Sequence, residues 1–433
     1  MTIRANGMPY QGPRLSAVST IGRDTPGLVM TDHMIVLSLM LAAFWVLDPF
    51  RVNLDRIAVV KHFPLLTLLA TLTFAAIGAR LFPRSAPGVR WSELASVLWP
   101  LGLFAAAVVT GSLVARFNLG IGNTFLNMGL FLLVIPMLAR VMCSLTDPAR
   151  FSRNYFMAVG VVAACVGFLE WAQYGKEGYF HGAEFIVIPI ATYIWFARIP
   201  VLLKILGVSL FLSFGVAVHK NTGYLVVLFT LSYCVFWTLR ARYQLLSEPR
   251  VRERYVAFSL FAGLGLASLL AAFFLVRDMI APDGNLQYRF HTYERAFTKF
   301  LESPVYGTAF TGAATERFDL FDVMTSVSNV LPTHSDPLDI LAHGGVIFSI
   351  LFVYGIWKLL RLMSRAAEAA PNSTVEQCLP GLHACTAVFL SGLLTMSFNP
   401  VMTQPNSALM LWTTTGIGLG LALYVKNSSR VLG

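Results

Sequence analysis

The polar residues best suited to chemistry lie in one stretch of this chain, from Gln287 to Gly345. Within it, His334 stands directly before Ser335-Asp336-Pro337 and a new apolar run, so we expect it just ahead of a helix N-terminus. The partial positive charge of a helix N-terminus disfavours imidazolium, and a neutral imidazole can accept a proton from a hydroxyl. His334 is therefore the candidate general base. The alternative is an interfacial histidine hydrogen-bonded to loop backbone.

Two carboxylates and a second histidine follow His334 in the sequence. We expect Asp336 to be the N-cap of the new helix, with Pro337 at its first position. Asp339 stands three residues later, where a carboxylate can reach back toward the cap. Capping is the favoured role for both aspartates. His343 precedes two glycines, and we interpret it as a packed residue at a close helix crossing.

Three cations indicate function: two arginines that suit the binding of phosphate, and one lysine. Arg289 and Arg295 belong to the aromatic-rich segment 288–300, which we expect to form an amphipathic helix on the membrane surface. Arginine suits bidentate binding of phosphate, although anchoring to lipid head groups is the alternative for both residues. Lys220 lies in a very short turn between two apolar runs. A charge at that depth is costly unless it faces a cavity or a partner, so Lys220 indicates function.

Other polar residues give weaker signals. His181, Glu184 and Glu294 are candidates for contacts with a glycan, although single polar residues near helix ends are more often interfacial anchors. The histidines show no H-x-H or H-x-x-x-H spacing, so we expect no metal site. The sequence has no glycine-rich phosphate loop, no G-x-S-x-G elbow and no nucleotide motif. We therefore expect neither a cofactor nor a nucleotide-sugar donor.

The elements that must position these residues are membrane helices. The chain is 56% hydrophobic and only 12% charged, half the charge of a typical soluble domain. We expect an all-α, polytopic integral membrane protein forming a single transmembrane domain over residues 1–433. Apolar runs of spanning length predict about twelve transmembrane helices, at roughly 28–47, 63–81, 94–114, 125–143, 154–172, 184–198, 201–218, 222–239, 255–275, 338–360, 380–397 and 407–425.

The basic residues predict the orientation of the chain. Most of the 32 Lys and Arg residues fall on one set of alternate loops, so both termini should be cytoplasmic and the long loop 276–337 periplasmic. The net charge of +10 is spread over short clusters, which argues against nucleic acid as a partner. Several basic residues nevertheless lie in the outer loop, where orientation does not require them. They predict an anionic partner, such as lipid head groups or lipid-linked phosphates.

Three motifs, taken in order, resemble a known family. Arg289, the passage Glu302-Ser303-Pro304-Val305-Tyr306-Gly307, and His334-Ser335 before Leu338 resemble the signature of the O-antigen ligase and Wzy-type polymerase superfamily. That signature has an Arg, an E-x-P-x-x-G passage and H-N-x-x-L-x-x-L leading into a helix with close glycines. Three departures are visible. Ser335 replaces the usual Asn, His343 stands where an acidic residue is common, and Lys220-Asn221-Thr222-Gly223 stands where members often carry Ser-Arg-Gly.

The resemblance implies a C-type glycosyltransferase-like enzyme of the bacterial inner membrane, with its active site in the periplasmic loop. Such enzymes use an undecaprenyl-diphosphate-linked glycan as donor, without a metal. The glycan passes either to another lipid-linked glycan, as in a polymerase, or to lipid A core, as in a ligase. By the resemblance, His334 would activate the acceptor hydroxyl. Arg289 would hold the donor diphosphate, with Lys220 and Arg295 as further ligands.

We expect a polymerase of repeat units for a surface polysaccharide, such as O-antigen, exopolysaccharide or capsule. An O-antigen ligase is the alternative within the family. From other classes, a transporter or flippase of lipid-linked glycans and a non-catalytic assembly scaffold are the rivals. The sequence shows no paired repeat halves and no matched glycine- or proline-broken spans, which argues against a transporter. Membrane lipids and other polysaccharide-assembly proteins are the further partners that we expect.

Overall fold

The structure is a computed structural model that describes most of the chain between residues 66 and 431. The described residues are 66, 68–73, 91–119, 125–145, 147–174, 183–217, 221–244, 284–311, 333, 335–370 and 375–431. Within these ranges every regular element is a helix, which confirms the all-α class for the described part of the chain.

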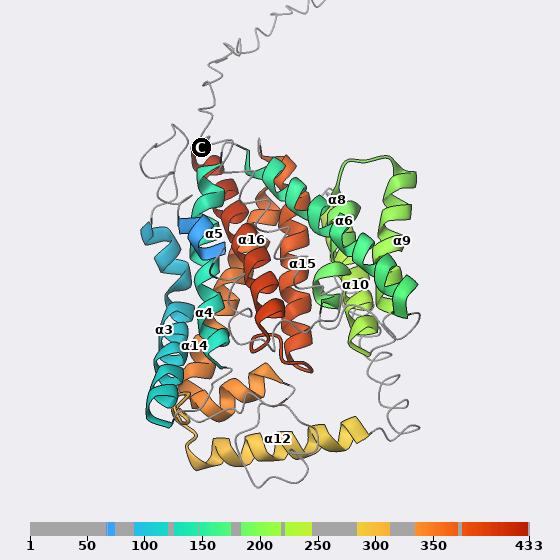
Figure 1. Ribbon diagram of the computed structural model, residues 1–433. Coiled ribbons are helices and arrows are strands. Elements are labelled where there is room, and N and C mark those ends of the chain that lie inside the picture. The colour runs from blue at the N-terminus through green and yellow to red at the C-terminus, as the bar shows by residue number, and fades with distance from the viewer. Residues whose placement is uncertain are drawn as a thin grey trace, which may run out of the picture.

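The helices form a bundle with one further helix laid across its end (Figure 1). The long helices of the bundle are α3 (Trp91–Leu119), α6 (Pro148–Tyr174), α10 (Asn221–Gln244), α14 (Asp336–Ala369), α15 (Leu379–Met396) and α16 (Pro405–Val431). The shorter helices are α4 (Phe125–Leu130), η3 (Phe131–Leu133), α5 (Val134–Ser144), α7 (Glu184–Val187), α8 (Ile190–Phe196), α9 (Val201–Ala217) and η6 (Glu376–Cys378). The helix across the end is α12 (Gly284–Glu302).

The described helices have the length and composition of a polytopic membrane protein. Seven are long and apolar enough to cross a membrane: Trp91–Ala115, Phe125–Ser144, Pro148–Leu169, Thr222–Ala241, Asp336–Ala369, Glu376–Met396 and Ser407–Ser428. Each coincides with a span predicted from the sequence. The predicted spans 28–47 and 255–275, and most of 63–81, lie outside the described residues. The count of twelve therefore stays a prediction.

The predicted span 184–198 is not one continuous helix. Helix α7 ends at Val187, and α8 begins at Ile190 after a turn at Ile188 and Pro189. Proline has no backbone N–H to donate to the preceding helical turn, and its ring crowds that turn, which explains the break. The two pieces together form a shorter apolar segment, Glu184–Phe196, and α9 is also shorter than a typical span.

Helix α16 is the centre of the bundle. It packs against α5, α14 and α15, and Trp412 on it is fully buried. A Cβ atom at Gly416 would lie 3.0 Å from Leu138 Cβ, and one at Gly420 would lie 2.4 Å from Met142 Cβ, both on α5. These two glycines, four residues apart, let the backbones approach closely, as small residues do between membrane helices.

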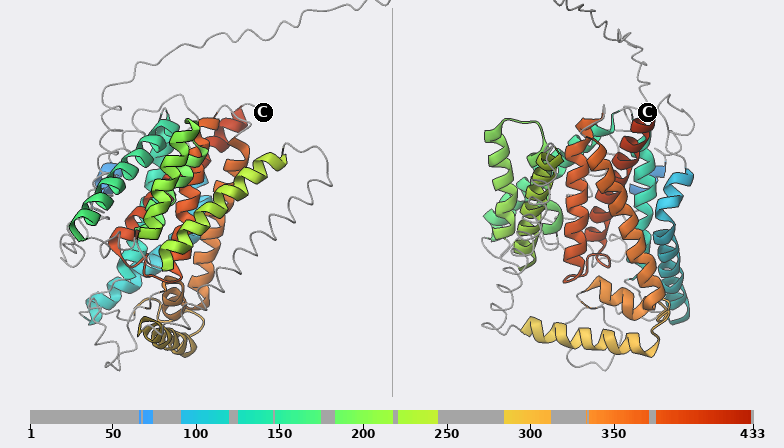
Figure 2. Two further views of the ribbon diagram at one scale, coloured as in Figure 1. Left: turned by 90° about the vertical axis from the view of Figure 1, so that its right-hand side faces the viewer. Right: turned by 180° about the vertical axis from the view of Figure 1, so that it is seen from behind.

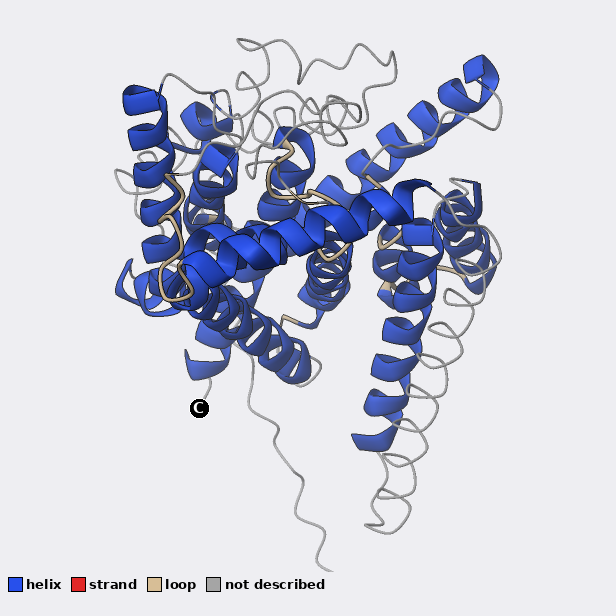
Figure 3. Cartoon of the chain, turned by 90° about the horizontal axis from the view of Figure 1, so that it is seen from below, coloured by secondary structure: helices blue, strands red, loops and turns tan. Residues whose placement is uncertain are grey.

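Helix α12 lies across one end of the bundle, nearly perpendicular to the long helices (Figures 1 and 3). It packs against α14. The amphipathic helix predicted over 288–300 is therefore confirmed, with bounds of Gly284–Glu302. One face is buried at Thr292 and Ala296, whereas Phe297 and Leu301 are exposed.

The C-terminus, where α16 ends, lies at the opposite end of the bundle from α12 (Figures 1 and 2). Arg198, in the link between α8 and α9, lies 2.6 Å from a carboxylate oxygen of Glu376. Lys426 lies 3.9 Å from Glu93. The sequence predicts that Arg198 and Lys426 lie on the same side of the membrane. The predicted orientation of the chain in the membrane stays a prediction.

Candidate active site

The buried face of α12 presents two cations to the bundle. Thr292, Arg295, Ala296 and Lys299 follow one another at spacings of three, one and three residues, so they share a face of the helix. Thr292 and Ala296 are buried, and Arg295 and Lys299 are half-buried. Glu294 is exposed on a different face. Packing of α12 on α14 therefore brings Arg295 and Lys299 close to the start of α14.

These four residues line a small cavity between α12 and α14. Its other walls are residues at and before the start of α14: Thr333, Asp339, Ala342 and His343. Segments about forty residues apart thus place two cations, a carboxylate and a histidine around one space.

Helix α14 is broken at Gly345, where φ is +63° and ψ is −167°. Such a break leaves backbone groups without their helical partners, and these need replacements away from water. The loop after α12 supplies them. Val346 N donates to Pro304 O at 2.9 Å, and Ile347 N donates to Val305 O at 3.1 Å. In return, His343 O accepts from the backbone N–H groups of Thr308 and Phe310, at 3.0 and 3.2 Å.

Two glycines make this contact possible. A Cβ atom at Gly345 would lie 2.6 Å from the carbonyl carbon of Val305, and one at Gly307 would lie 2.4 Å from His343 O. Both residues also have positive φ, +63° and +58°, which side-chain-bearing residues adopt at a cost. The glycine that ends the passage Glu302–Gly307 is therefore required by backbone packing. The passage acts as a brace between α12 and the broken helix.

Phe310, just after the passage Glu302–Gly307, anchors this loop in the core of the bundle. Its side chain is fully buried, with ring centroids 5.8 Å from Phe104, 6.0 Å from Phe125 and 5.8 Å from Phe348. Ala309 and Phe310 both have positive φ, 48° and 60°, although neither is glycine. Burial of the aromatic ring offsets this backbone strain, which is common near functional sites. The brace is thus held in one conformation.

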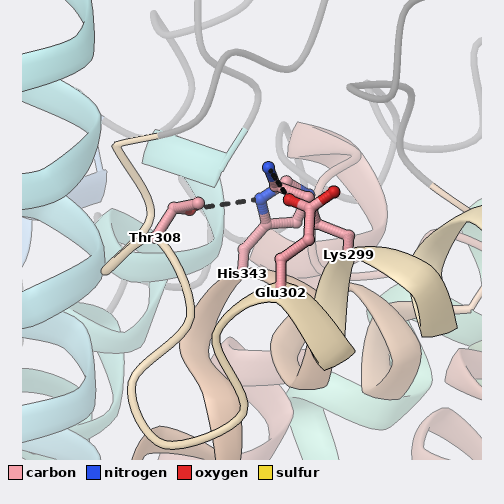
Figure 4. A network of polar contacts seen from close by, with 4 residues as sticks. All are labelled: Lys299, Glu302, Thr308 and His343. Atoms are coloured by element: carbon pink, nitrogen blue, oxygen red, sulfur yellow. Dashed lines mark hydrogen bonds and ion pairs between the residues drawn. The ribbon is translucent and has the colours of Figure 1, made fainter.

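His343 is buried and contacts Phe125 of α4, and Figure 4 shows it beside Thr308. Its Nδ1 lies 3.5 Å from Thr308 Oγ1, and its ring centroid lies 4.7 Å from that of Phe125. Nearby, Lys299 Nζ donates to Glu302 Oε2 at 2.8 Å (Figure 4). His343 is therefore a packed residue, as its glycine neighbours indicated. Its partners are a loop and α4 rather than a helix crossing, and it also lines the cavity.

The start of α14 differs by one residue from the prediction. The N-cap is Ser335, in extended conformation, and Asp336 already belongs to the helix. The buried carboxylate of Asp336 instead accepts the backbone N–H groups of Val401 and Met402 on one oxygen, at 2.8 and 2.7 Å. Its assignment as N-cap was therefore wrong, because a distant loop competes for its oxygens.

The Asp339 carboxylate reaches back toward the segment before the helix, as predicted. Its Oδ1 accepts the backbone N–H of Thr333 at 2.8 Å. Thr333 is the last described residue before position 334, and it lines the same cavity as Arg295 and Lys299. The carboxylate therefore ties the segment before the helix to the helix itself.

The structure describes some of the predicted site residues and leaves others outside the described ranges. His334, Lys220 and His181 lie outside the described residues. Arg289 lies on α12, but only its backbone is described. Arg295 lines the cavity. The roles assigned to these five residues stay predictions.

The two glutamates do not line the cavity. Glu294 is exposed on α12. Glu184 is buried in α7, and its Oε1 accepts from Thr222 Oγ1 at 3.4 Å. Thr222 lies at the start of α10, two residues after Lys220. The structure thus places Glu184 beside the segment that follows Lys220, in a second polar region separate from the cavity.

Sequence reasoning missed Lys299 and Thr333. Lys299 stands one helical turn after Arg295, and this spacing of four residues was a usable signal once the helix was predicted. Thr333 gave no such signal, because its contacts with Asp339 and Ser335 depend on a turn that the sequence does not specify. Among the described residues, no group of three or more His, Cys, Asp or Glu side chains could hold a metal ion.

Comparison with known proteins agrees with the motifs. Residues 206–353 match the family model described as O-Antigen ligase. The matched segment runs from within α9 through α10 and α12 to the middle of α14, so it contains the cavity and the brace. No curated protein matches the chain. The resemblance to the O-antigen ligase and Wzy-type polymerase superfamily is therefore confirmed over residues 206–353.

Proposed function

We propose that this protein is a membrane glycosyltransferase of polysaccharide biosynthesis, acting on glycans linked to undecaprenyl diphosphate, and that it polymerises their repeat units. The family match over residues 206–353 supports the O-antigen ligase or polymerase class. The observation that carries the proposal is the cavity between α12 and α14. There Arg295 and Lys299 face Thr333, the residue directly before His334.

The donor diphosphate is bound by the cations of α12. Arg295 can bind two phosphate oxygens at once, and Lys299 adds a second positive charge one helical turn away. The ion pair with Glu302 holds Lys299 near the cavity. On the outer face, Phe297 and Leu301 are exposed, which suits a helix that lies in the membrane interface. A lipid-linked diphosphate would reach the cations at that depth.

The transfer needs one proton acceptor and one set of cations. His334 takes the proton of the acceptor hydroxyl, and the oxygen forms a bond to the anomeric carbon of the donor glycan. The bond from that carbon to the diphosphate oxygen breaks, and its electron pair leaves with the diphosphate. Arg289, Arg295 and Lys299 stabilise the growing negative charge. The proton on His334 then passes to water.

The proposed orientation places this chemistry in the periplasm. The fold supports it, because α12 lies at the end of the bundle opposite the C-terminal end of α16, the helix that carries Lys426. Basic residues near span ends favour the cytoplasm. The inner membrane, cytoplasmic termini, a lipid-linked acceptor and contacts with other assembly proteins are parts of the same proposal.

A ligase is the second candidate, because the matching family model bears the description O-Antigen ligase. In that case the acceptor is lipid A core. The diphosphate site and the base would be the same for both acceptors.

The experiment that tests the function is the isolation of lipid-linked glycans from a strain without the gene. Single repeat units on the lipid carrier are the expected result, because a missing polymerase leaves them unextended. Polymerised chains still on the carrier would identify a ligase. Repeat units confined to the cytoplasmic leaflet would identify a flippase and contradict the proposal. An unchanged glycan pool would remove the protein from this reaction altogether.

A further inference from the structure

The segment before α14 is held by an unusual set of short-range bonds. Asp339 Oδ1 accepts the backbone N–H of Thr333 at 2.8 Å. The hydroxyl of Thr333 donates to Ser335 O at 2.8 Å and accepts from Ser335 N at 3.1 Å. All three residues are at most 4% exposed. The residues on both sides of position 334 are therefore fixed to each other and to the first turns of α14.

Burial of a carboxylate at this position is unfavourable in free energy. Within the described part of the chain, Asp339 Oδ2 is buried and has no hydrogen-bond partner. Burying a carboxylate with one oxygen unpaired is unfavourable, and a neutral side chain could accept one N–H at lower cost. Asp339 also lines the cavity that holds Arg295 and Lys299. Its position is better explained by a role at this site than by the stability of the helix.

Asp336 provides the comparison within the same helix. It stands three residues earlier and is equally buried, and it also leaves one carboxylate oxygen without a hydrogen-bond partner among the described residues. Its bonded oxygen holds Val401 and Met402, in the connection between α15 and α16. It is not among the residues that line the cavity. Of the two aspartates, only Asp339 connects the cavity to Thr333.

We infer that Asp339 is a positioning residue, which holds Thr333 beside the cations of α12 and so fixes the two described residues that flank position 334. This inference rests on the proposed function, in which position 334 holds the base. A base must lie within hydrogen-bond reach of the hydroxyl it deprotonates, and a displacement of 1 Å can lower turnover about 100-fold. Binding of the donor depends on the cations, so the anchor affects kcat rather than KM.

The test uses the full-length protein in lipid nanodiscs. The donor is the lipid-linked glycan that accumulates in the deletion strain. We expect Asp339→Ala to lower kcat about 100-fold with KM for the donor unchanged within about threefold. Asp339→Asn should retain most of the activity, because an amide oxygen can still accept the N–H of Thr333. Thr333→Val, which keeps the shape but loses the hydroxyl, should lower kcat about tenfold.

The matched control is Asp336→Ala. It removes an equally buried carboxylate from the same turn, so it reports the effect of lost stability alone. We expect a lower melting temperature for this variant, with kcat per folded protein close to that of the wild type. Equal losses of kcat in the two alanine variants would overturn the inference. An Asp339→Asn variant as inactive as Asp339→Ala would also overturn it, because the backbone anchor would then not be the cause.

Two further arms keep the result decisive. If Asp339→Ala does not fold, Asp339→Leu, which fills the same space but has no acceptor for the Thr333 N–H, carries the test, and wild-type kcat in that variant refutes the anchor. His334→Ala is measured in parallel. An active His334→Ala variant refutes the proposed function itself. An inactive His334→Ala variant together with an active Asp339→Ala variant refutes only the positioning role.

Discussion

Replacement of Gly345 by alanine should release the brace from α14. The residue has φ +63° and ψ −167°, a region that is populated almost only by glycine. A Cβ atom there would lie 2.6 Å from Val305 C, 2.7 Å from Tyr306 N and 2.7 Å from Gly307 N. All three are backbone atoms, so no side-chain rotation can relieve the clash. Either α14 straightens or the passage 305–307 moves away.

The size of the effect follows from these contacts. Adoption of this backbone region by alanine costs about 1–3 kcal/mol, and overpacking costs about 1–3 kcal/mol more. Displacement of the loop also weakens the bonds from Val346 N and Ile347 N, each worth about 1 kcal/mol. With both bonds lost the sum is about 4–8 kcal/mol, a large fraction of the stability of a typical domain. The cavity should be lost as well, because α12 is held to α14 through this loop.

The assay is thermal unfolding of the purified protein in detergent, followed by size-exclusion chromatography. We expect the apparent Tm of Gly345→Ala to fall by about 5–10 °C, with loss of glycan transfer. The matched control is Gly102→Ala, on α3, where a Cβ atom would meet nothing within 4 Å. It should unfold as the wild type does. An unchanged Tm and unchanged transfer in Gly345→Ala would refute the account of the brace.

Three other predictions concern charge, orientation and metal dependence. Arg289→Lys should lower turnover more than Lys220→Arg, because only the first change loses a bidentate fork; equal, small effects would argue that neither residue binds phosphate. In a variant without the native cysteines, Glu294→Cys should react with a membrane-impermeant maleimide in intact spheroplasts, and Glu376→Cys only after permeabilisation; the reverse pattern would invert the topology. Dialysis against EDTA should leave turnover unchanged, and a loss restored by a divalent cation would contradict the expected mechanism.

Local features of the fold were predictable from the sequence. The amphipathic helix over 288–300 was predicted from its aromatic-rich composition and its arginines, and the span predicted at 380–397 matches α15 (Leu379–Met396) closely. Hydropathy located these helices because length and polarity decide whether a helix spans or lies on a membrane. The break at Pro189 was missed, because two short apolar helices have the same composition as one span.

The site was predictable only in part, because its geometry depends on contacts between distant segments. Asp336 has the sequence position of an N-cap, but its carboxylate binds the N–H groups of Val401 and Met402, more than sixty residues away. The motif Glu302–Gly307 was recognised as a resemblance, whereas its physical role appeared only with its contacts to α14. Lys299 could have been found from its spacing to Arg295. Thr333 could not, since its bonds require the fold of the turn.

The reaction at position 334 is the centre of the proposal, and one measurement tests it most directly. Glycan transfer by purified His334→Ala is compared with that of the wild type, at equal protein level and with equal binding of the lipid-linked donor. We predict that transfer is abolished while insertion into the membrane and donor binding persist. Transfer at a substantial fraction of the wild-type rate would contradict the assignment of the base, and with it the mechanism proposed for this protein.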